Sequence, residues 1–430
     1  MIRIIDSRSA EADQFIDKLD RRGQFENPEI LHTVSQILKA VQEKGDQAVI
    51  DYTHQFDSTQ VSVENLRVTG AEFDQAQQIV DNDFLISIRK AKANIQKFHQ
   101  RQVRQSWIST EEYGVILGHL IRPLDRVGVC VPSVSQLLVS SLLMNVLPPQ
   151  VVGVREIAIF MGPQPNGTID PHMLVAASEC NTREIYKCGG AQAVAAMAYG
   201  TKSIQRVDKI VGPGNPYVQQ AKRQVMGLVD IDKIAGPSEV LVIADGKANP
   251  SYVAADLISQ AEHGVDSSAI LVTTSQTLAQ AVKSQIQIQA ERLPRQVEIV
   301  GSFNNYGVAL VVEDLDQAVE LANRIAPEHL GLVVQDPYAI LGCIRNAGAI
   351  MVGEYTPESV GDYIAGPNHI LPTGGTARFA SPLSVDDFIK KTSLIQYTQS
   401  ALNQIGSSVI KLAETEGLAG HATAIAIRQS

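Results

Sequence analysis

Short β-branched runs alternate with helical patterns from about residue 114 onward, and this alternation limits the possible folds more than any other feature. Amphipathic stretches between such runs predict helices that cover both faces of parallel sheets. The runs form two series separated near residues 230–236, so we expect two α/β units rather than one wide sheet. The expected strands are Val127–Val131, Ile157–Phe160, Glu184–Lys187 and Lys209–Val211, then Val240–Ile243, Ala269–Thr273, Val297–Val300, Val308–Val312, Gly331–Val334 and Ala349–Val352.

The two ends of the chain predict helices that lie outside these units. Residues 1 to about 105 have a helical character, and Pro28–Lys44 shows the clearest helical period, followed by Gly45 as a stop. The tail returns to a helical pattern from about Ser381, with Leu394–Leu412 as the main candidate helix. We therefore expect helical additions at both termini.

Charge and cysteine usage argue against several classes of function. Lys and Arg number 36 against 46 Asp and Glu, so the formal charge is −10 and a basic footprint for nucleic acid or anionic membrane is absent. No stretch approaches the roughly 18 apolar residues that a membrane span requires. The four cysteines form no paired motif, which favours reduced thiols in a cytoplasm over disulfides. We expect a cytoplasmic protein without a nucleic-acid or membrane partner.

The usual nucleotide fingerprints are missing, but two glycine-bearing turns lie where a nucleotide site is expected. Neither G-x-G-x-x-G after a strand nor G-x-x-x-x-G-K-[ST] occurs in the sequence. The turns at 188–192 and 211–215 each join the carboxyl end of an expected strand to a helix, where open α/β sheets bind ligands. For each turn, a tight connection without a ligand is the alternative.

Polar groups suited to a divalent metal occur in the second half of the chain. Gln260 and His263 are i, i+3 on one face of an expected helix, and Asp362, His369 and His421 follow among other polar residues. An amide oxygen, imidazoles and a carboxylate together suit a cation such as zinc. Singly, each has a structural alternative: a histidine that interacts with a helix dipole, a turn aspartate, or a surface group.

The adjacent pair Glu328-His329 indicates acid–base chemistry. It follows Pro327 at the end of a helical pattern and opens an apolar strand, so both side chains are expected near a sheet edge. A carboxylate and an imidazole side by side can act as two general bases, or as a base and the group that orients it. A histidine at a helix terminus beside a solvated glutamate is the alternative.

Nine motifs along nearly the whole chain resemble the histidinol dehydrogenase family, in order and in spacing. They are Gly189–Gly200, Val211–Asn215, Ala235–Glu239, Gln260–Gly264, Ala326–Leu330, Gly361–His369, Leu371–Thr373, Ala377–Phe379 and Glu416–His421. The resemblance implies an enzyme that oxidises L-histidinol through an aldehyde to L-histidine, with reduction of two NAD+, in the last steps of histidine biosynthesis.

The resemblance also implies an α/β fold of two incomplete Rossmann-like parallel-sheet domains with helical N-terminal and C-terminal additions, assembled as an intertwined homodimer. We expect an N-terminal helical arm at 1–25 and a zinc and substrate domain formed by 26–120 and 238–380. The NAD-side domain is expected at 121–237. The C-terminal helical tail, 381–430, is expected to reach the partner subunit.

Site residues follow from the matched motifs, one position at a time. The resemblance implies Glu328 and His329 as catalytic residues, with His329 taking the hydroxyl proton and Glu328 activating water for the second oxidation. One zinc ion per subunit is expected on Gln260, His263, Asp362 and His421, the last supplied by the partner subunit. The four zinc ligands, His329, Ser238, Glu416 and His369 are expected to contact the substrate, and Gln192 and Asn215 to contact NAD.

One segment departs from the family pattern Val-Gly-x-Tyr-Val-Pro-Gly-Gly. This chain has Cys130 where the family has an NAD-contacting tyrosine, and Ser133 and Val134 where it has two glycines. The change removes a stacking surface and a hydrogen-bonding group, and it adds bulk near the expected cofactor. Alternative functions are therefore a related zinc-dependent dehydrogenase of another small polar alcohol, a paralogue with impaired NAD use, or a non-catalytic zinc and metabolite-binding protein.

Overall fold

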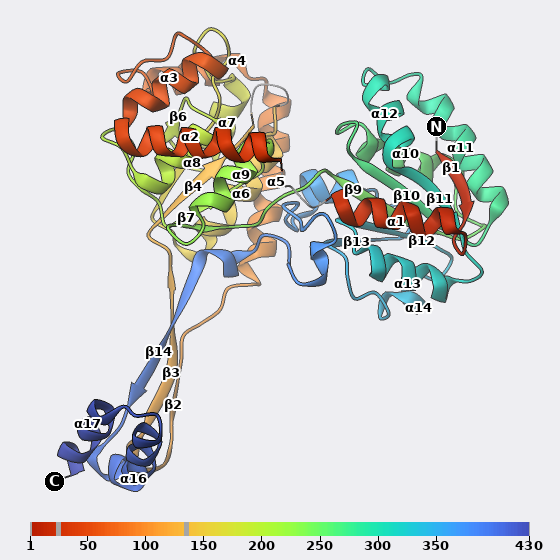
Figure 1. Cartoon of the computed structure of the whole chain (residues 1–430). Helices are drawn as coiled ribbons and strands as arrows, with labels where there is room; N and C mark the ends of the chain where they lie inside the picture. Colours follow the sequence, from red (N-terminus) through yellow and green to blue (C-terminus); the bar gives the residue numbers. More distant parts are fainter. Residues whose placement is uncertain (1, 23–26, 133–136, 430) are drawn as a thin grey trace.

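The computed structural model describes residues 2–22, 27–132 and 137–429, and these form two α/β bodies and a projecting arm (Figure 1). The arm carries the C-terminus far from both bodies. No helix among the described residues is both long and apolar enough to cross a membrane.

The first body is built on a six-stranded parallel sheet in the order β1-β11-β10-β9-β12-β13. Its strands alternate in the face they bury: Leu241 and Ile243 of β9 pack toward one helical layer, and Val240 and Val242 toward the other. The strands are β1 Arg3–Asp6, β9 Glu239–Ala244, β10 Ser268–Thr273, β11 Gly307–Val311, β12 His329–Val333 and β13 Ala349–Val352. The first layer contains α1 Ala10–Arg22, α13 Leu315–Ile325 and α14 Pro337–Leu341, and the second α10 Pro250–Ala261, α11 Gln276–Ala290 and α12 Gln296–Tyr306.

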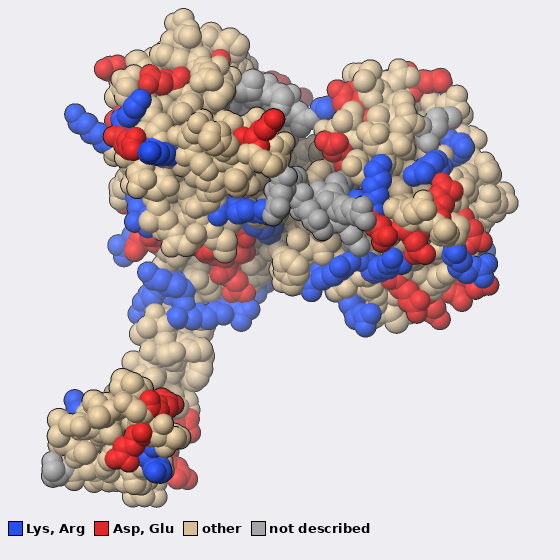
Figure 2. All heavy atoms as spheres, in the orientation of Figure 1, with Lys and Arg blue, Asp and Glu red and all other residues tan. Residues whose placement is uncertain are grey.

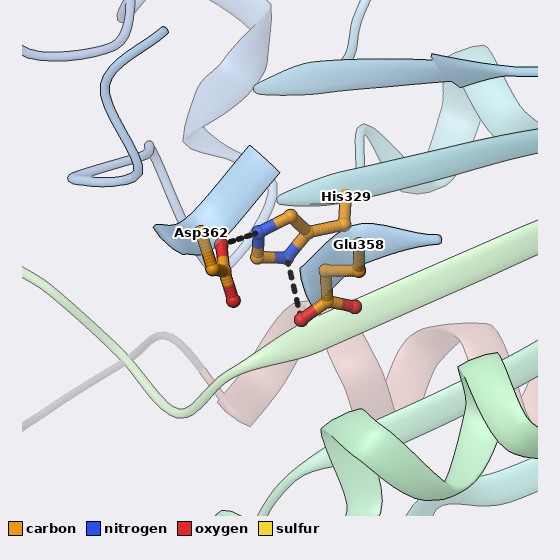
Figure 3. Close-up of side chains that lie close together, drawn as sticks. All are labelled: His329, Glu358 and Asp362. Atoms are coloured by element: carbon orange, nitrogen blue, oxygen red, sulfur yellow. Dashed lines mark ion pairs between the residues drawn. The ribbon is translucent and has the colours of Figure 1, made fainter. Parts of the chain in front are cut away.

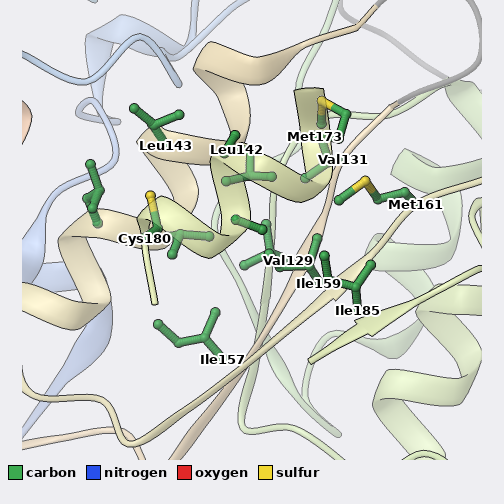
Figure 4. Close-up of a cluster of buried hydrophobic side chains, with 14 of the residues drawn as sticks. Val129, Val131, Leu142, Leu143, Ile157, Ile159, Met161, Met173, Cys180 and Ile185 are labelled. Carbon is green, nitrogen blue, oxygen red and sulfur yellow. The ribbon is translucent and has the colours of Figure 1, made fainter. Parts of the chain in front are cut away.

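The second body is built on a five-stranded parallel sheet in the order β6-β5-β4-β7-β8. One of its two cores, in which Val129 and Ile159 of the sheet pack against Leu142, is shown in Figure 4. The strands are β4 Arg126–Cys130, β5 Glu156–Phe160, β6 Ile185–Tyr186, β7 Lys209–Val211 and β8 Asp230–Ile231. One face is covered by α4 Gly70–Ile79, α5 Asn82–Gln100, α6 Val139–Val152 and α7 Pro171–Glu179, and the other by α2 Pro28–Lys44, α3 Asp46–Phe56, α8 Gly190–Tyr199 and α9 Pro216–Val225.

The arm is a three-stranded antiparallel sheet that ends in two helices (Figure 1). Its strands are β2 Trp107–Thr110, β3 Ile116–Pro123 and β14 Ile389–Gln396, with the short helix η1 Glu112–Gly114 at the far end. The helices α16 Gln399–Thr415 and α17 Ala419–Gln429 pack on each other there. Between the first body and the arm the chain forms α15 Glu358–Val360 and the short turns η2 Gly361–Ala365, η3 Thr376–Arg378 and η4 Val385–Phe388.

The packing differs from the expected boundaries at both ends of the chain. Residues 2–22 are not a separate helical arm, because β1 pairs with β11 and α1 packs on the first body. Residues 27–100, expected with the zinc domain, instead cover the five-stranded sheet, because α2 to α5 bury their apolar faces there. The tail from 381 is not wholly helical, since β14 occupies the first part of the helix expected at 394–412.

A strand was also expected at Val297–Val300, but these residues lie in α12. The structure buries Ile299, Ser302 and Phe303, which recur at the i, i+3, i+4 spacing of a helix. The helical period continues beyond the short apolar run that suggested a strand, and these residues therefore form a helix.

Candidate active site

The candidate site lies where the amino edge of the six-stranded sheet meets the carboxyl edge of the five-stranded sheet. The chain crosses between these edges directly, from β8 to the start of β9 at Glu239. His329 is the first residue of β12, and Glu328 precedes it. Helix α10 begins after the carboxyl end of β9 and runs back to the amino edge, so Gln260, in its last turn, reaches the same place.

A second segment brings two carboxylates to this edge. Glu358 opens α15, and Asp362 lies in the π-helical turn η2 that follows directly. The turn is tied to the second body, because the side-chain amide of Asn94 in α5 donates to the carbonyl oxygen of Ile364 at 2.8 Å. The two bodies therefore share this segment, and its carboxylates face the amino end of β12 (Figure 3).

His369 fixes the backbone of this segment. Its Nδ1 lies 2.8 Å from the carbonyl oxygen of Asp362, which can only accept, so Nδ1 carries the hydrogen. Its Nε2 then accepts from the hydroxyl of Ser141 in α6 at 3.1 Å. Both ring nitrogens of His369 are thus engaged within the chain.

His329 is the centre of the cluster, and Figure 3 shows Asp362 and Glu358 beside its two ring nitrogens. Nε2 lies 3.5 Å from Oδ1 of Asp362, and Nδ1 lies 3.8 Å from Oε1 of Glu358. Nδ1 also lies 3.1 Å from the carbonyl oxygen of Glu239, an acceptor only. In the neutral ring the hydrogen therefore sits on Nδ1, and the lone pair is on Nε2.

Glu328 is held beside the same ring. Its Oε2 accepts from the backbone N–H of Glu239 at 2.9 Å and from the amide of Gln260 at 3.4 Å, and it lies 3.8 Å from Nδ1 of His329. Gln260 is 1 % exposed, and its Oε1 has no hydrogen-bond partner among the described residues. A buried acceptor without a donor suits a cation ligand.

Crowded charges shift the pKa values of this cluster. Burial raises the pKa of Glu328 to about 7 and that of Glu358 to about 8. Burial would lower the pKa of His329, but Glu358, Glu328 and Asp362 outweigh it and raise that pKa to about 10. For Asp362, burial opposes ionisation, yet the hydrogen bond and charge of His329 keep its pKa below the usual value. Ionising all three carboxylates around one imidazole is therefore unfavourable in the chain alone, and a divalent cation would compensate their charge.

The expected zinc ligands divide between two places in the chain. Gln260 and Asp362 lie in the cluster. His263 follows α10 directly; burial lowers the pKa of its imidazole, and the nearby Asp362 carboxylate acts in the opposite direction. His421 does not lie in the cluster: it is exposed on α17, at the far end of the arm (Figure 1). Glu416, at the end of α16, is also exposed there. Within one chain the donor set is three residues. Amide oxygen, imidazole and carboxylate are a chemically suitable set for zinc.

A cavity of about 430 Å³ opens onto the cluster, with His329, Asp362, His369 and Ile350 in its lining. This volume lies in the range of small-ligand pockets. Ser238 is half-buried just before β9, where its carbonyl oxygen accepts from the N–H of Ser268. The cluster is therefore reachable by a small polar molecule.

The expected cofactor residues lie at the carboxyl edge of the five-stranded sheet. The chain order reverses between β4 and β7, and such switch points form ligand crevices. Asn215 caps α9 through Oδ1, which accepts from the N–H groups of Tyr217 and Val218 and leaves its Nδ2 free to donate. Gln192 in α8 is 1 % exposed, and neither of its amide atoms has a hydrogen-bond partner among residues 2–22, 27–132 and 137–429.

The turn after β7 requires glycine at position 212. Its φ is +108°, and a Cβ there would lie 2.1 Å from the carbonyl oxygen of Cys130. Lys222, fully buried and paired with Asp232, donates to the carbonyl oxygen of Gly212 at 3.0 Å and holds the turn. The backbone is therefore fixed close to β4.

Cys130 itself is a core residue, 7% exposed. Its side chain is buried in the core between the sheet and α8, and burial raises the pKa of its thiol to about 12. Ser133 and Val134, the other two departures from the family pattern, lie outside the described residues.

Glu358 is the residue that the sequence reasoning missed. It is 4 % exposed and lies beside His329, yet no motif contains it. The available signal was its i, i+4 spacing from Asp362, which places two carboxylates on one face of a helical turn.

Fold and site together fit an α/β dehydrogenase: a parallel sheet with a switch point in its strand order, and a buried acid–imidazole cluster with donors for a cation. The family model described as histidinol dehydrogenase matches residues 20–429. The chain belongs to the histidinol dehydrogenase family, which confirms the resemblance found in its motifs.

Individual relatives agree along the whole chain. Histidinol dehydrogenases of Clostridium acetobutylicum and Heliobacterium mobile are 47% and 49% identical, each over 100% of this chain and 99% of the relative. A crystal structure of histidinol dehydrogenase from Elizabethkingia anophelis is 36% identical with a TM-score of 0.93, covering 99% of this chain and 98% of that one.

Proposed function

We propose that the chain oxidises L-histidinol through L-histidinal to L-histidine, with reduction of two NAD+, in the last steps of histidine biosynthesis. The observation that carries the proposal is the buried cluster at the amino end of β12, where His329, Glu328, Gln260 and Asp362 meet beside a cavity. The family membership supplies the substrate and the cofactor.

His329 takes the hydroxyl proton of the alcohol. Its Nδ1 is committed to the carbonyl oxygen of Glu239, so Nε2, on the side of Asp362, is the nitrogen that exchanges the proton. A cation held by Asp362 would offset the carboxylate charge that raises the pKa of His329, and would so favour the neutral ring that acts as a base. The second oxidation requires the hydrated aldehyde, and Glu328 is the carboxylate that activates the water for it. Gln192 and Asn215 would hold NAD+, which when bound would supply the hydride acceptor for both oxidations.

Zinc would be held by Gln260, His263 and Asp362 of one subunit and His421 of the partner subunit. When bound, the metal supplies a positive charge that orients the nitrogen atoms of the substrate. Ser238, Glu416 and His369 are the further substrate contacts in this proposal. His369 acts indirectly as well, since it fixes the backbone that carries Asp362.

An intertwined homodimer is part of the proposal because the arm of a single chain exposes large apolar side chains. Trp107, Ile108 and Ile395 of its sheet are 51%, 60% and 69% exposed, and Leu412 of α16 is 64% exposed. The middle of the arm shows few charged side chains (Figure 2). A second copy that packs on this surface would bury apolar area and carry His421 to the zinc site.

We also place the enzyme in the cytoplasm, without a nucleic-acid or membrane partner. The support is its acidic balance and the four cysteines, Cys130, Cys180, Cys188 and Cys343, all of which are free thiols.

An absorbance assay tests this function. We expect the purified protein to form two NADH per histidinol, and removal of metal with a chelator to abolish turnover until zinc is restored. Turnover of another small polar alcohol but not histidinol would support the related dehydrogenase instead. Zinc and histidinol binding without NADH formation would indicate that the Cys130 segment impairs NAD use.

A further inference from the structure

Glu358 is a buried carboxylate that the proposed mechanism does not use. Its side chain is among the least exposed of the charged groups at the site, at 4 % of the residue surface. Its Oε2 has no hydrogen-bond partner among the described residues, and its Oε1 lies 3.8 Å from Nδ1 of His329. Burying a carboxylate is costly unless a positive group compensates it, and the histidine is the positive group at hand.

The two nitrogens of His329 face different surroundings (Figure 3). Nδ1 donates to the carbonyl oxygen of Glu239 at 3.1 Å, with Glu358 on the same side of the ring. Nε2 lies on the side of Asp362. A proton that arrives at Nε2 makes the ring an imidazolium, and its charge then faces Glu358 through the Nδ1 side.

Glu328 is the other carboxylate at the same distance, 3.8 Å from Nδ1. Its Oε2 already accepts from the N–H of Glu239 and the amide of Gln260, and the proposed function assigns it to water activation. The proposed function assigns no water activation or other role to Glu358.

We propose that Glu358 is a positioning residue for His329: the Glu239 carbonyl holds the hydrogen on Nδ1, and the Glu358 carboxylate offsets the charge of the ring once Nε2 has taken the hydroxyl proton. In that step the O–H bond breaks, its proton moves to Nε2, and the electron pair left on oxygen forms the carbonyl as the carbon gives hydride to NAD+. The inference rests on the proposed role of His329 in histidinol oxidation.

A metal-ligand role for Glu358 is the competing interpretation. One ligand atom each of His329, Glu358 and Asp362 lies within 4.8 Å of the others, close enough to hold an ion. However, Nδ1 faces a backbone carbonyl and carries hydrogen, so it has no lone pair for a metal. Glu358 and Asp362 also approach opposite nitrogens of the ring, which favours positioning.

The variant Glu358→Gln tests the inference, with steady-state kinetics and zinc content measured together. We expect kcat to fall about 10- to 100-fold, the KM for histidinol and the zinc content to stay unchanged, and the solvent deuterium isotope effect on kcat to rise as proton transfer slows. Glu358→Asp, which keeps the charge, should recover part of kcat. Glu354→Gln is the matched control, since that carboxylate is exposed and lies before the same turn.

Three outcomes overturn the inference. Loss of zinc in Glu358→Gln would make the residue a ligand. A kcat equal to that of the wild type would leave it without a role in the reaction. A loss of kcat with an unchanged isotope effect and no recovery in Glu358→Asp would point to a packing role. Failure of the wild-type protein to oxidise histidinol would count against the proposed function, which separates the two hypotheses.

Discussion

Replacement of His329 by Asn is expected to lower kcat for histidinol oxidation by about 100- to 10,000-fold, the usual contribution of a general base. Asparagine keeps a polar group of similar reach but cannot take a proton at the position of Nε2. The zinc content should stay at the wild-type level, because Nε2 is assigned to the substrate proton rather than to the metal. Initial-rate kinetics and metal analysis of the same preparation measure both effects.

His32→Asn is the matched control for this variant, since His32 is exposed on α2, on the second body. His32→Asn should change neither kcat nor the zinc content. Zinc loss in His329→Asn would reassign the residue as a ligand, whereas wild-type turnover would show that another group removes the hydroxyl proton.

Asp362→Asn is expected to cost the enzyme its metal. The carboxylate interacts with the charges of His329 and His263, and asparagine removes its charge at nearly constant size. Even residues that only support metal ligands contribute about 10- to 100-fold to metal affinity, so loss of a ligand should weaken zinc binding by at least about 100-fold. Turnover should fall with the zinc content and recover partly at high zinc concentration.

The exposed Asp316 on α13 provides the control variant Asp316→Asn, which should retain zinc and activity. Full zinc occupancy in Asp362→Asn together with lost turnover would contradict the ligand assignment. The residue would then act on His329 alone.

Several of the parallel strands could be predicted from the sequence. The expected Lys209–Val211 and Ala349–Val352 match β7 and β13, because β-branched runs between turn residues fix such strands locally. The strands β1 and β14 could not be predicted in this way. β1 pairs with a strand about 300 residues later in the chain, and β14 has an exposed, polar sequence that forms only beside β3.

Motifs found the acid–imidazole pair and the amide at the end of α10 because each lies within a short run that matches the family pattern. Glu358 was missed because its importance comes from the contact with His329, which the packing of α15 against the edge of the sheet creates. His421 was expected from its motif, but its position relative to the site could not be derived from one chain. It lies on α17 at the far end of the arm, and in the proposed dimer it reaches the site only when the arm packs on a second copy.

In the proposed enzyme, groups from distant parts of the sequence, one of them from the partner subunit, converge on one cation beside His329. A heterodimer of one His329→Asn chain and one His421→Asn chain, purified through two different affinity tags, tests it directly. In a shared-site dimer one site receives both lesions and the other none, so the heterodimer should show about half of the wild-type activity while each mutant homodimer is inactive. A purified heterodimer without activity would mean that each site takes both residues from a single chain, which would contradict the account.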